Sequence, residues 1–150
     1  MTNERKTESI VRSHFEQFKD LVEIEEQASD IPKIDKLLKT ASKKGGGKGK
    51  PEFLITFKSN SNLLIVIECK ADISKHESKS KDKFYDYAVD GALLYSSYLS
   101  KEFDILAIAV SGEDARHLKV SHFLQLKNER KTIPIFGDKL LTAQDYLDGY

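Results

Sequence analysis

The sequence contains a single cysteine, Cys69, and no hydrophobic run long enough to cross a membrane. One thiol excludes an internal disulfide framework, and no Cys/His spacing indicates a zinc site. Spanning a bilayer takes about 20 apolar residues, and no apolar segment follows a basic start as it does in a secretory signal. We therefore expect a cytoplasmic protein with no membrane partner.

The chain also lacks an excess of either charge, with 24 Lys and Arg against 24 Asp and Glu. Proteins that bind DNA unaided are usually basic, so this balance argues against strong independent affinity for DNA. The phosphate loop of ATPases is missing as well, because the glycine-rich segment 45–49 has no following Ser or Thr and leads into a strand. A chain of 150 residues is long enough for one compact domain and short for two.

Two short apolar runs, residues 53–57 and 63–67, predict a β-hairpin. Both are rich in β-branched or aromatic residues, and the polar segment Ser59–Asn62 between them has the composition of a turn. Glu52 stands at the start of the first run, and Glu68-Cys69-Lys70 follows the second.

The register of this hairpin decides whether those charged side chains meet. Side chains alternate across a strand, so Glu68 and Lys70 share one face and Cys69 points to the other. A turn centred on Asn60 or Ser61 places Glu52 beside Glu68 or Lys70, whereas a centre between those two residues puts Glu52 out of phase.

The rest of the chain predicts an α/β fold with a central mixed sheet flanked by helices. An apolar stripe indicates one long helix from residue 2 to about 27, and a second helix of 84–99 joins the hairpin to a buried strand at 103–110. A strand, a helix and another apolar strand indicate a parallel pair. Further elements are expected as a short helix at 34–41, edge strands at 123–127 and 133–136, and a terminal helix beginning near Thr142.

Two carboxylates and a lysine at one sheet edge have the chemistry of a magnesium-dependent phosphodiesterase. Mg²⁺ prefers carboxylate oxygens and needs only one or two of them, which Glu52 and Glu68 would supply with the Cys69 main-chain carbonyl as a third ligand. Lys70 would orient the attacking water or stabilise negative charge. The competing interpretation is a solvated ion pair at a strand end.

Pro51-Glu52 and Glu68-Cys69-Lys70 resemble the signature of the PD-(D/E)xK nuclease superfamily, with Glu in place of the usual first Asp. The longer strings at 42–45, 47–53, 67–72 and 75–78 resemble the N-terminal nuclease module of bacterial restriction–modification proteins of type I or type IIG. This resemblance implies a restriction-endonuclease-like α-β-β-β-α-β core, Mg²⁺ (or Mn²⁺ as a substitute) and hydrolysis of double-stranded DNA. It also implies a methyltransferase or specificity domain or subunit as partner, so residues 1–150 would be a single nuclease domain in the N-terminal part of a longer polypeptide.

Several further residues are candidates for the site. In the family a carboxylate on the first helix reaches the metal, and Glu8 and Glu26 are the candidates here. The basic stretch before Glu52 suggests contacts with the DNA backbone, balanced by the alternative of a solvated loop. His76 is a candidate for a phosphate or the metal's water shell, although a surface histidine is the commoner case. The DNA-binding candidates are Lys43, Lys44, Lys48, Lys50 and His76.

The resulting hypothesis is a restriction endonuclease domain, a phosphodiester hydrolase that acts with a partner that finds the sequence. Cutting both strands generally needs two active centres, which would require a transient dimer. Two alternatives remain open: a nuclease-like module that binds DNA or a partner without catalysis, and a nuclease of DNA repair or junction resolution.

Overall fold

The computed structural model describes residues 4–42 and 48–150, and within them six strands form one mixed sheet accompanied by four α-helices. The strands lie side by side in chain order, from β1 to β6. The elements are α1 (Glu4–Glu16), β1 (Val22–Glu25), α2 (Pro32–Leu38), β2 (Phe53–Phe57), β3 (Asn60–Lys70), α3 (Ala88–Leu99), β4 (Asp104–Ser111), β5 (Lys119–Gln125), β6 (Ile133–Pro134) and α4 (Ala143–Gly149), with short 3-10 turns η1 (Ile73–Lys75) and η2 (Ala115–His117).

The predicted parallel pair is confirmed. β3 and β4 run parallel from Leu63 opposite Asp104 to Lys70 opposite Ser111, and α3 forms the crossover between them. The other four strand pairs are antiparallel, which makes the sheet mixed. The carboxyl ends of β3 and β4 therefore lie at the same edge of the sheet.

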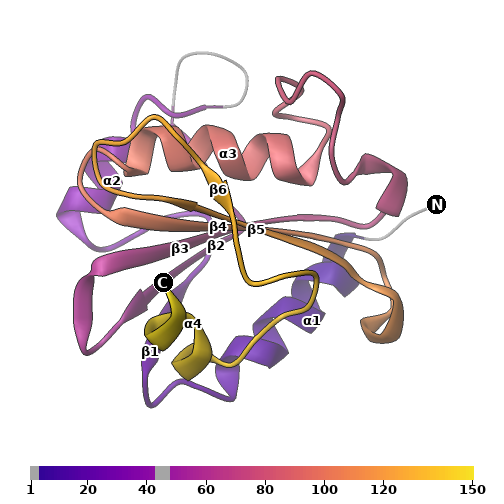
Figure 1. Ribbon diagram of the computed structural model, residues 1–150, viewed down its shortest axis with the longest axis horizontal. Helices are drawn as coiled ribbons and strands as arrows, with labels where there is room; N and C mark the ends of the chain where they lie inside the picture. The colour runs from indigo at the N-terminus through magenta and orange to yellow at the C-terminus, as the bar shows by residue number, and fades with distance from the viewer. Residues whose placement is uncertain (1–3, 43–47) are drawn as a thin grey trace.

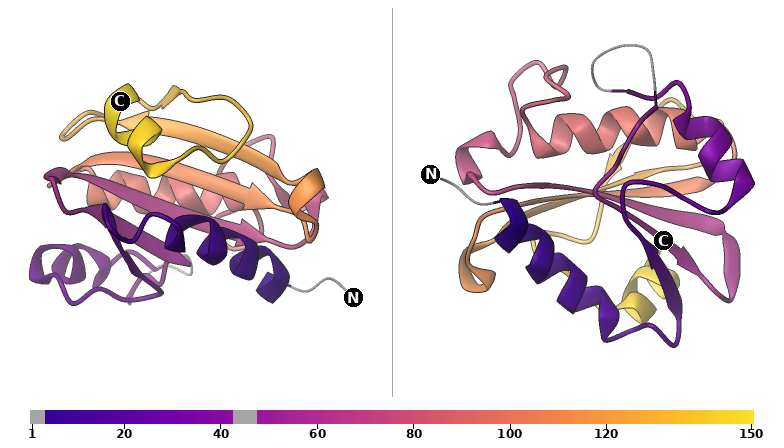
Figure 2. Two further views of the ribbon diagram at one scale, coloured as in Figure 1. Left: turned by 90° about the horizontal axis from the view of Figure 1, so that it is seen from below. Right: turned by 180° about the vertical axis from the view of Figure 1, so that it is seen from behind.

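Helices cover both faces of the sheet (Figure 1). Alternate residues of β3 divide between two apolar clusters, because successive side chains of a strand point to opposite faces. One cluster packs the strands against α1 and α4, and the other packs them against α2 and α3; Figure 2 shows the same layers from below and from behind. The first contains Leu63, Ile65, Ile67, Val11, Phe15 and Tyr146, and the second contains Leu64, Val66, Ile34, Leu38, Ala92 and Tyr95.

The long helix predicted over residues 2–27 is wrong in its second half. α1 ends at Glu16, and Val22–Glu25 forms β1, which pairs antiparallel with β2. Val22 and Ile24 fit both a helical stripe and the alternation of a strand. The segment forms a strand because its backbone pairs with the edge of β2.

Several other predictions hold with shifted bounds. The hairpin turn is Lys58–Ser59, so Asn60–Asn62 belong to β3 and not to a four-residue turn. The strand expected at 123–127 is β5, which lies between β4 and β6 and is therefore not at the edge. The short edge strand β6 and the terminal helix α4, capped by the Thr142 hydroxyl, are confirmed.

Candidate active site

The hairpin places Glu52 and Glu68 opposite each other. The ladder between β2 and β3 pairs Phe53 with Ile67, and one more step along it brings Glu52, just before β2, across from Glu68. This is the pairing expected for a turn centred on Asn60, although the turn itself is Lys58–Ser59, because the register of the ladder shifts between Thr56 and Phe57. Glu68 is completely buried and Glu52 is half-buried. Both lie at the edge of the sheet where β2 begins and β3 ends, here called the rim.

Helix α1 brings two further carboxylates to the same rim. One carboxylate oxygen each of Glu4, Glu8 and Glu52 lies within 4.8 Å of the others. Glu8 is one of the two predicted first-helix ligands, and Glu4 was not predicted. The signal that points to Glu4 is its spacing of four residues from Glu8, which puts both side chains on one face of the helix.

Hydrogen bonds at the strand ends hold α1 in this position. The buried Thr7 hydroxyl donates to the Gly112 carbonyl at 2.5 Å, and the Gly112 N–H donates to the Lys70 carbonyl at 2.9 Å. Gly112 has a φ of +117°, a conformation that favours glycine. The first turns of α1 are thus tied directly to the ends of β3 and β4.

The electrostatics of the rim show how closely the acidic groups gather. Loss of solvation raises the pKa of Glu8, and the nearby Glu4 carboxylate raises it further. Burial raises the pKa of the Cys69 thiol well above its usual value, and the charges of Glu52, Glu68, Glu8 and Glu4 add to that effect. Like charges this close repel one another unless a cation or a proton is shared between them.

Lys70 contacts both the acidic rim and the loop before α3. Its ammonium lies 3.7 Å from Glu4 Oε1 and donates to the Tyr85 carbonyl at 2.9 Å. The Tyr85 ring centroid lies 5.8 Å from the same nitrogen. Lys70 therefore stands at the rim beside the carboxylates, where its sequence position predicts it.

Cys69 points to the other face of the sheet, as the alternation predicts, and its side chain is completely buried in the cluster under α1. Its main-chain carbonyl stays a predicted ligand.

Glu26 does not join the acidic cluster. It follows β1 instead of lying on the first helix, and the Arg12 guanidinium binds both of its carboxylate oxygens, at 2.9 and 2.5 Å. The hydrogen bonds from Arg12 lower the pKa of Glu26. Of the two acidic residues predicted on the first helix, the structure therefore brings Glu8 to the rim and leaves Glu26 in an ion pair.

The predicted DNA-binding lysines are only partly described. Lys43 and Lys44 lie outside the described residues. Lys48 is bound to Asp35 at 2.7 Å, and Lys50 is exposed beside Pro51. Between them Gly49 sits so close to Ala41 and Tyr95 that a Cβ there would lie 2.7 Å from the Ala41 carbonyl oxygen.

The structure corrects the interpretation of His76 as a surface residue or a phosphate ligand. The His76 side chain is buried, with Nδ1 2.7 Å from the Ser111 hydroxyl and Nε2 2.8 Å from the Ser121 hydroxyl. Burial lowers the pKa of His76 to about 4, so the ring is neutral at neutral pH. With both nitrogens engaged, His76 joins the segment after β3 to β4 and β5.

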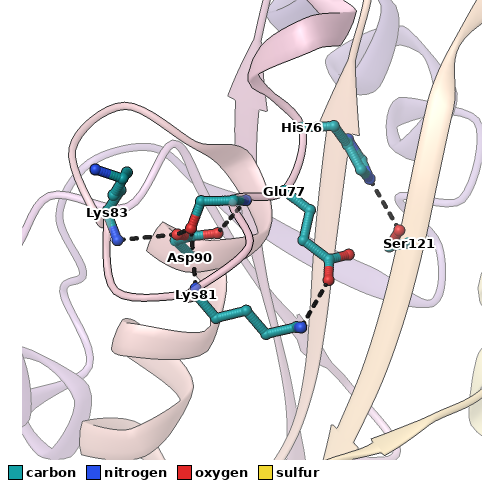
Figure 3. A network of polar contacts seen from close by, with 7 residues as sticks. His76, Glu77, Lys81, Lys83, Asp90 and Ser121 are labelled. Atoms are coloured by element: carbon teal, nitrogen blue, oxygen red, sulfur yellow. Dashed lines mark hydrogen bonds and ion pairs between the residues drawn. The ribbon is translucent and has the colours of Figure 1, made fainter.

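Asp90 is a buried polar residue whose role the sequence did not indicate. Its side chain is completely buried in the first turn of α3 and accepts hydrogen bonds from the Ser78 N–H at 3.1 Å, the Lys83 N–H at 2.9 Å and the Ser78 hydroxyl (Figure 3). The available signal is an acidic residue within the apolar start of a helix, since a buried carboxylate needs partners.

Comparisons with family models, with curated proteins and with solved structures found no match. None of the helices among the described residues is long and apolar enough to cross a bilayer.

Proposed function

We propose that this chain is a magnesium-dependent DNA endonuclease domain that hydrolyses phosphodiester bonds in a restriction–modification system. The observation that carries the proposal is the gathering of Glu4, Glu8 and Glu52 within 4.8 Å, at the rim where Glu68 and Lys70 end β3. A solvated ion pair would not account for three clustered carboxylates beside a buried fourth.

The residues at the rim suit a hard divalent cation. All the side-chain donors are carboxylate oxygens, which Mg²⁺ and Mn²⁺ prefer, and a cation bound between Glu4, Glu8 and Glu52 would neutralise their gathered negative charge. Glu52, Glu68 and Glu8 would hold the ion, with Glu4 beside them. When bound, such an ion lowers the pKa of a coordinated water and neutralises charge on a phosphate.

Lys70 has the position of the group that acts on the substrate. The Lys70 side chain is 21% exposed, and its ammonium donates to the Tyr85 carbonyl and lies 3.7 Å from Glu4 Oε1. An ammonium carries three donors, so the remaining N–H groups can orient a water or a phosphate oxygen. A fixed positive charge beside the scissile group stabilises the negative charge that develops during hydrolysis.

The order of elements supports the same assignment. Leaving out α2, the chain runs α1, β1, β2, β3, α3, β4, which is the α-β-β-β-α-β order that the sequence resemblance implies. The balanced net charge fits a cutting domain that depends on a methyltransferase or specificity partner for tight binding of DNA.

The direct test is cleavage of supercoiled plasmid in Mg²⁺, comparing the wild-type chain with Glu68→Ala and Lys70→Ala. We expect both variants to lose cutting by at least a hundredfold. Glu16→Gln and Lys101→Gln, which change an exposed residue of α1 and one in the turn that follows α3, are matched controls that should cut normally. Circular dichroism melting checks that each variant is folded.

Calorimetric titration with Mn²⁺ separates this proposal from its nearest rival. A nuclease requires saturable binding that Glu52→Gln weakens, whereas a wild-type chain that binds no Mn²⁺ would be a nuclease-like module without catalysis. Equal cutting by the wild type, Glu68→Ala and Lys70→Ala would end the assignment.

A further inference from the structure

The segment between β3 and α3 has the composition of a nucleic-acid-binding surface. Residues 75–85, here called the lysine loop, contain four lysines against two acidic residues. Of the four strongly exposed large hydrophobic side chains among the described residues, Ile73 just precedes the loop and Tyr85 ends it, with exposed fractions of 55% and 57%. Lysines interleaved with exposed apolar and aromatic side chains are typical of surfaces that bind the phosphate backbone and the sugars or bases beside it.

Buried polar groups fix the conformation of this loop. Asp90 binds the backbone N–H groups of Ser78 and Lys83, and so holds two points of the loop five residues apart (Figure 3). The Ser78 hydroxyl in turn accepts from the Lys81 N–H at 2.9 Å, and the His76 carbonyl accepts from the Val89 N–H at 2.8 Å. The loop is therefore a positioned element, and its exposed lysines are displayed from a defined backbone.

The lysines of the loop differ in what they contact. Lys81 forms an ion pair with Glu77 at 3.0 Å. Lys79 and Lys83 are exposed, and no carboxylate among the described residues forms an ion pair with either. Because the ordered backbone holds both ammonium groups in solvent, they can bind an anion that approaches from outside the protein, such as a phosphate.

The loop ends at the catalytic rim. The carbonyl of Tyr85, the last residue of the loop, accepts a hydrogen bond from the Lys70 ammonium, which lies 3.7 Å from Glu4. A duplex with one phosphate at the acidic cluster would therefore bring neighbouring phosphates toward the loop.

We propose that the lysine loop binds the phosphate backbone of double-stranded DNA beside the active site, with Lys79 and Lys83 as the contacting residues. The choice of DNA as ligand rests on the proposed function. This assignment moves the backbone contacts from the lysines that precede Glu52 to those that follow Lys70, and it gives Asp90 a positioning role.

The test is a fluorescence anisotropy titration of a dye-labelled 30-base-pair duplex in Ca²⁺ at several NaCl concentrations between 50 and 200 mM. Each lost phosphate contact lowers the slope of log K against log[salt] by about 0.9, so Lys79→Gln/Lys83→Gln should bind more weakly with a slope shallower by about 1.8. Both side chains are exposed, and unchanged thermal melting will show that the variant is folded.

A matched control lies at the opposite end of the sheet. Lys101 and Lys127 are exposed and flank Asp104, where β4 begins, whereas the acidic cluster lies where β3 ends. Lys101→Gln/Lys127→Gln removes the same charge and should keep the wild-type slope. A loop variant that binds like the wild type, an equal loss in the control, or a wild-type chain that binds no duplex would each overturn the inference.

Failure of this inference is distinguishable from failure of the proposed function. A chain that cuts plasmid through Glu68 and Lys70 but binds DNA equally well without Lys79 and Lys83 would remove only the loop's role. A chain whose loop variant loses DNA binding, but which neither binds Mn²⁺ nor cuts, would keep the loop's role and remove the nuclease.

Discussion

Replacing Asp90 with Ala should destabilise the protein by about 3 kcal/mol, because two backbone N–H groups and one hydroxyl lose their buried acceptor. Leaving a buried donor without a partner costs about 1–3 kcal/mol, and relaxation of the loop toward solvent recovers part of the total. Asp90→Asn keeps the shape and one acceptor oxygen, so it should lose about half as much.

Urea unfolding followed by far-ultraviolet circular dichroism measures this loss. With a slope of about 2 kcal/mol per molar urea, the Ala variant should unfold at a midpoint about 1.5 M lower than the wild type. Asp86→Ala removes an exposed acid from the neighbouring segment and should stay within about 0.5 kcal/mol of the wild type. An Asp90→Ala protein as stable as the Asp86→Ala protein would refute the argument that Asp90 holds the loop.

Three other perturbations test separate parts of the structure. Because burial holds the pKa of His76 near 4, below its unfolded value of about 6.5, the unfolded chain binds the extra proton first. Stability should therefore fall as pH drops from about 6.5 toward 4, which melting at a series of pH values measures. The His76→Gln protein should lose less stability over this range. The similarly buried His122 is present in both proteins and contributes equally to each. Gly49→Ala should lower the free energy of unfolding, measured in urea, by about 1–3 kcal/mol. The reason is that its Cβ would lie 2.7 Å from the Ala41 carbonyl oxygen and 2.8 Å from the Tyr95 ring. No measurable loss would mean that the neighbouring atoms move away without cost. Glu4→Gln should weaken Mn²⁺ binding about tenfold in calorimetry, while Glu16→Gln on the same helix should not, and equal effects would indicate only a change in overall charge.

Local patterns in the sequence were enough to predict the two hairpin strands and the parallel pair, whereas the pairing of Glu52 with Glu68 was one of several registers that the sequence left open. Those predictions depend on the pattern of apolar residues within each segment and on the composition of the turns. Few arrangements of the strands fit that pattern once one face of the sheet is buried. β1 was missed because Leu21, Val22 and Ile24 continue the apolar stripe of the preceding helix, and only pairing with β2 distinguishes the two periods.

The residues of the site that were missed depend on tertiary contacts. Glu4 reaches the rim because Thr7 binds Gly112, a contact 105 residues apart in the chain. His76 sits in a polar stretch that resembles a surface loop, and the serines that bury it come from β4 and β5. Asp90 finds its partners in the preceding loop, where the sequence shows only ordinary Ser and Lys residues.

The sealed environment of Cys69 has a practical consequence. Thiolates, not thiols, react with alkylating dyes and oxidants, and this thiol is both enclosed and kept protonated by its surroundings. The native chain should therefore remain unlabelled by maleimides while folded. A cysteine introduced at an exposed position would then be its single reactive handle, so a fluorophore or spin probe could be attached there without first removing Cys69.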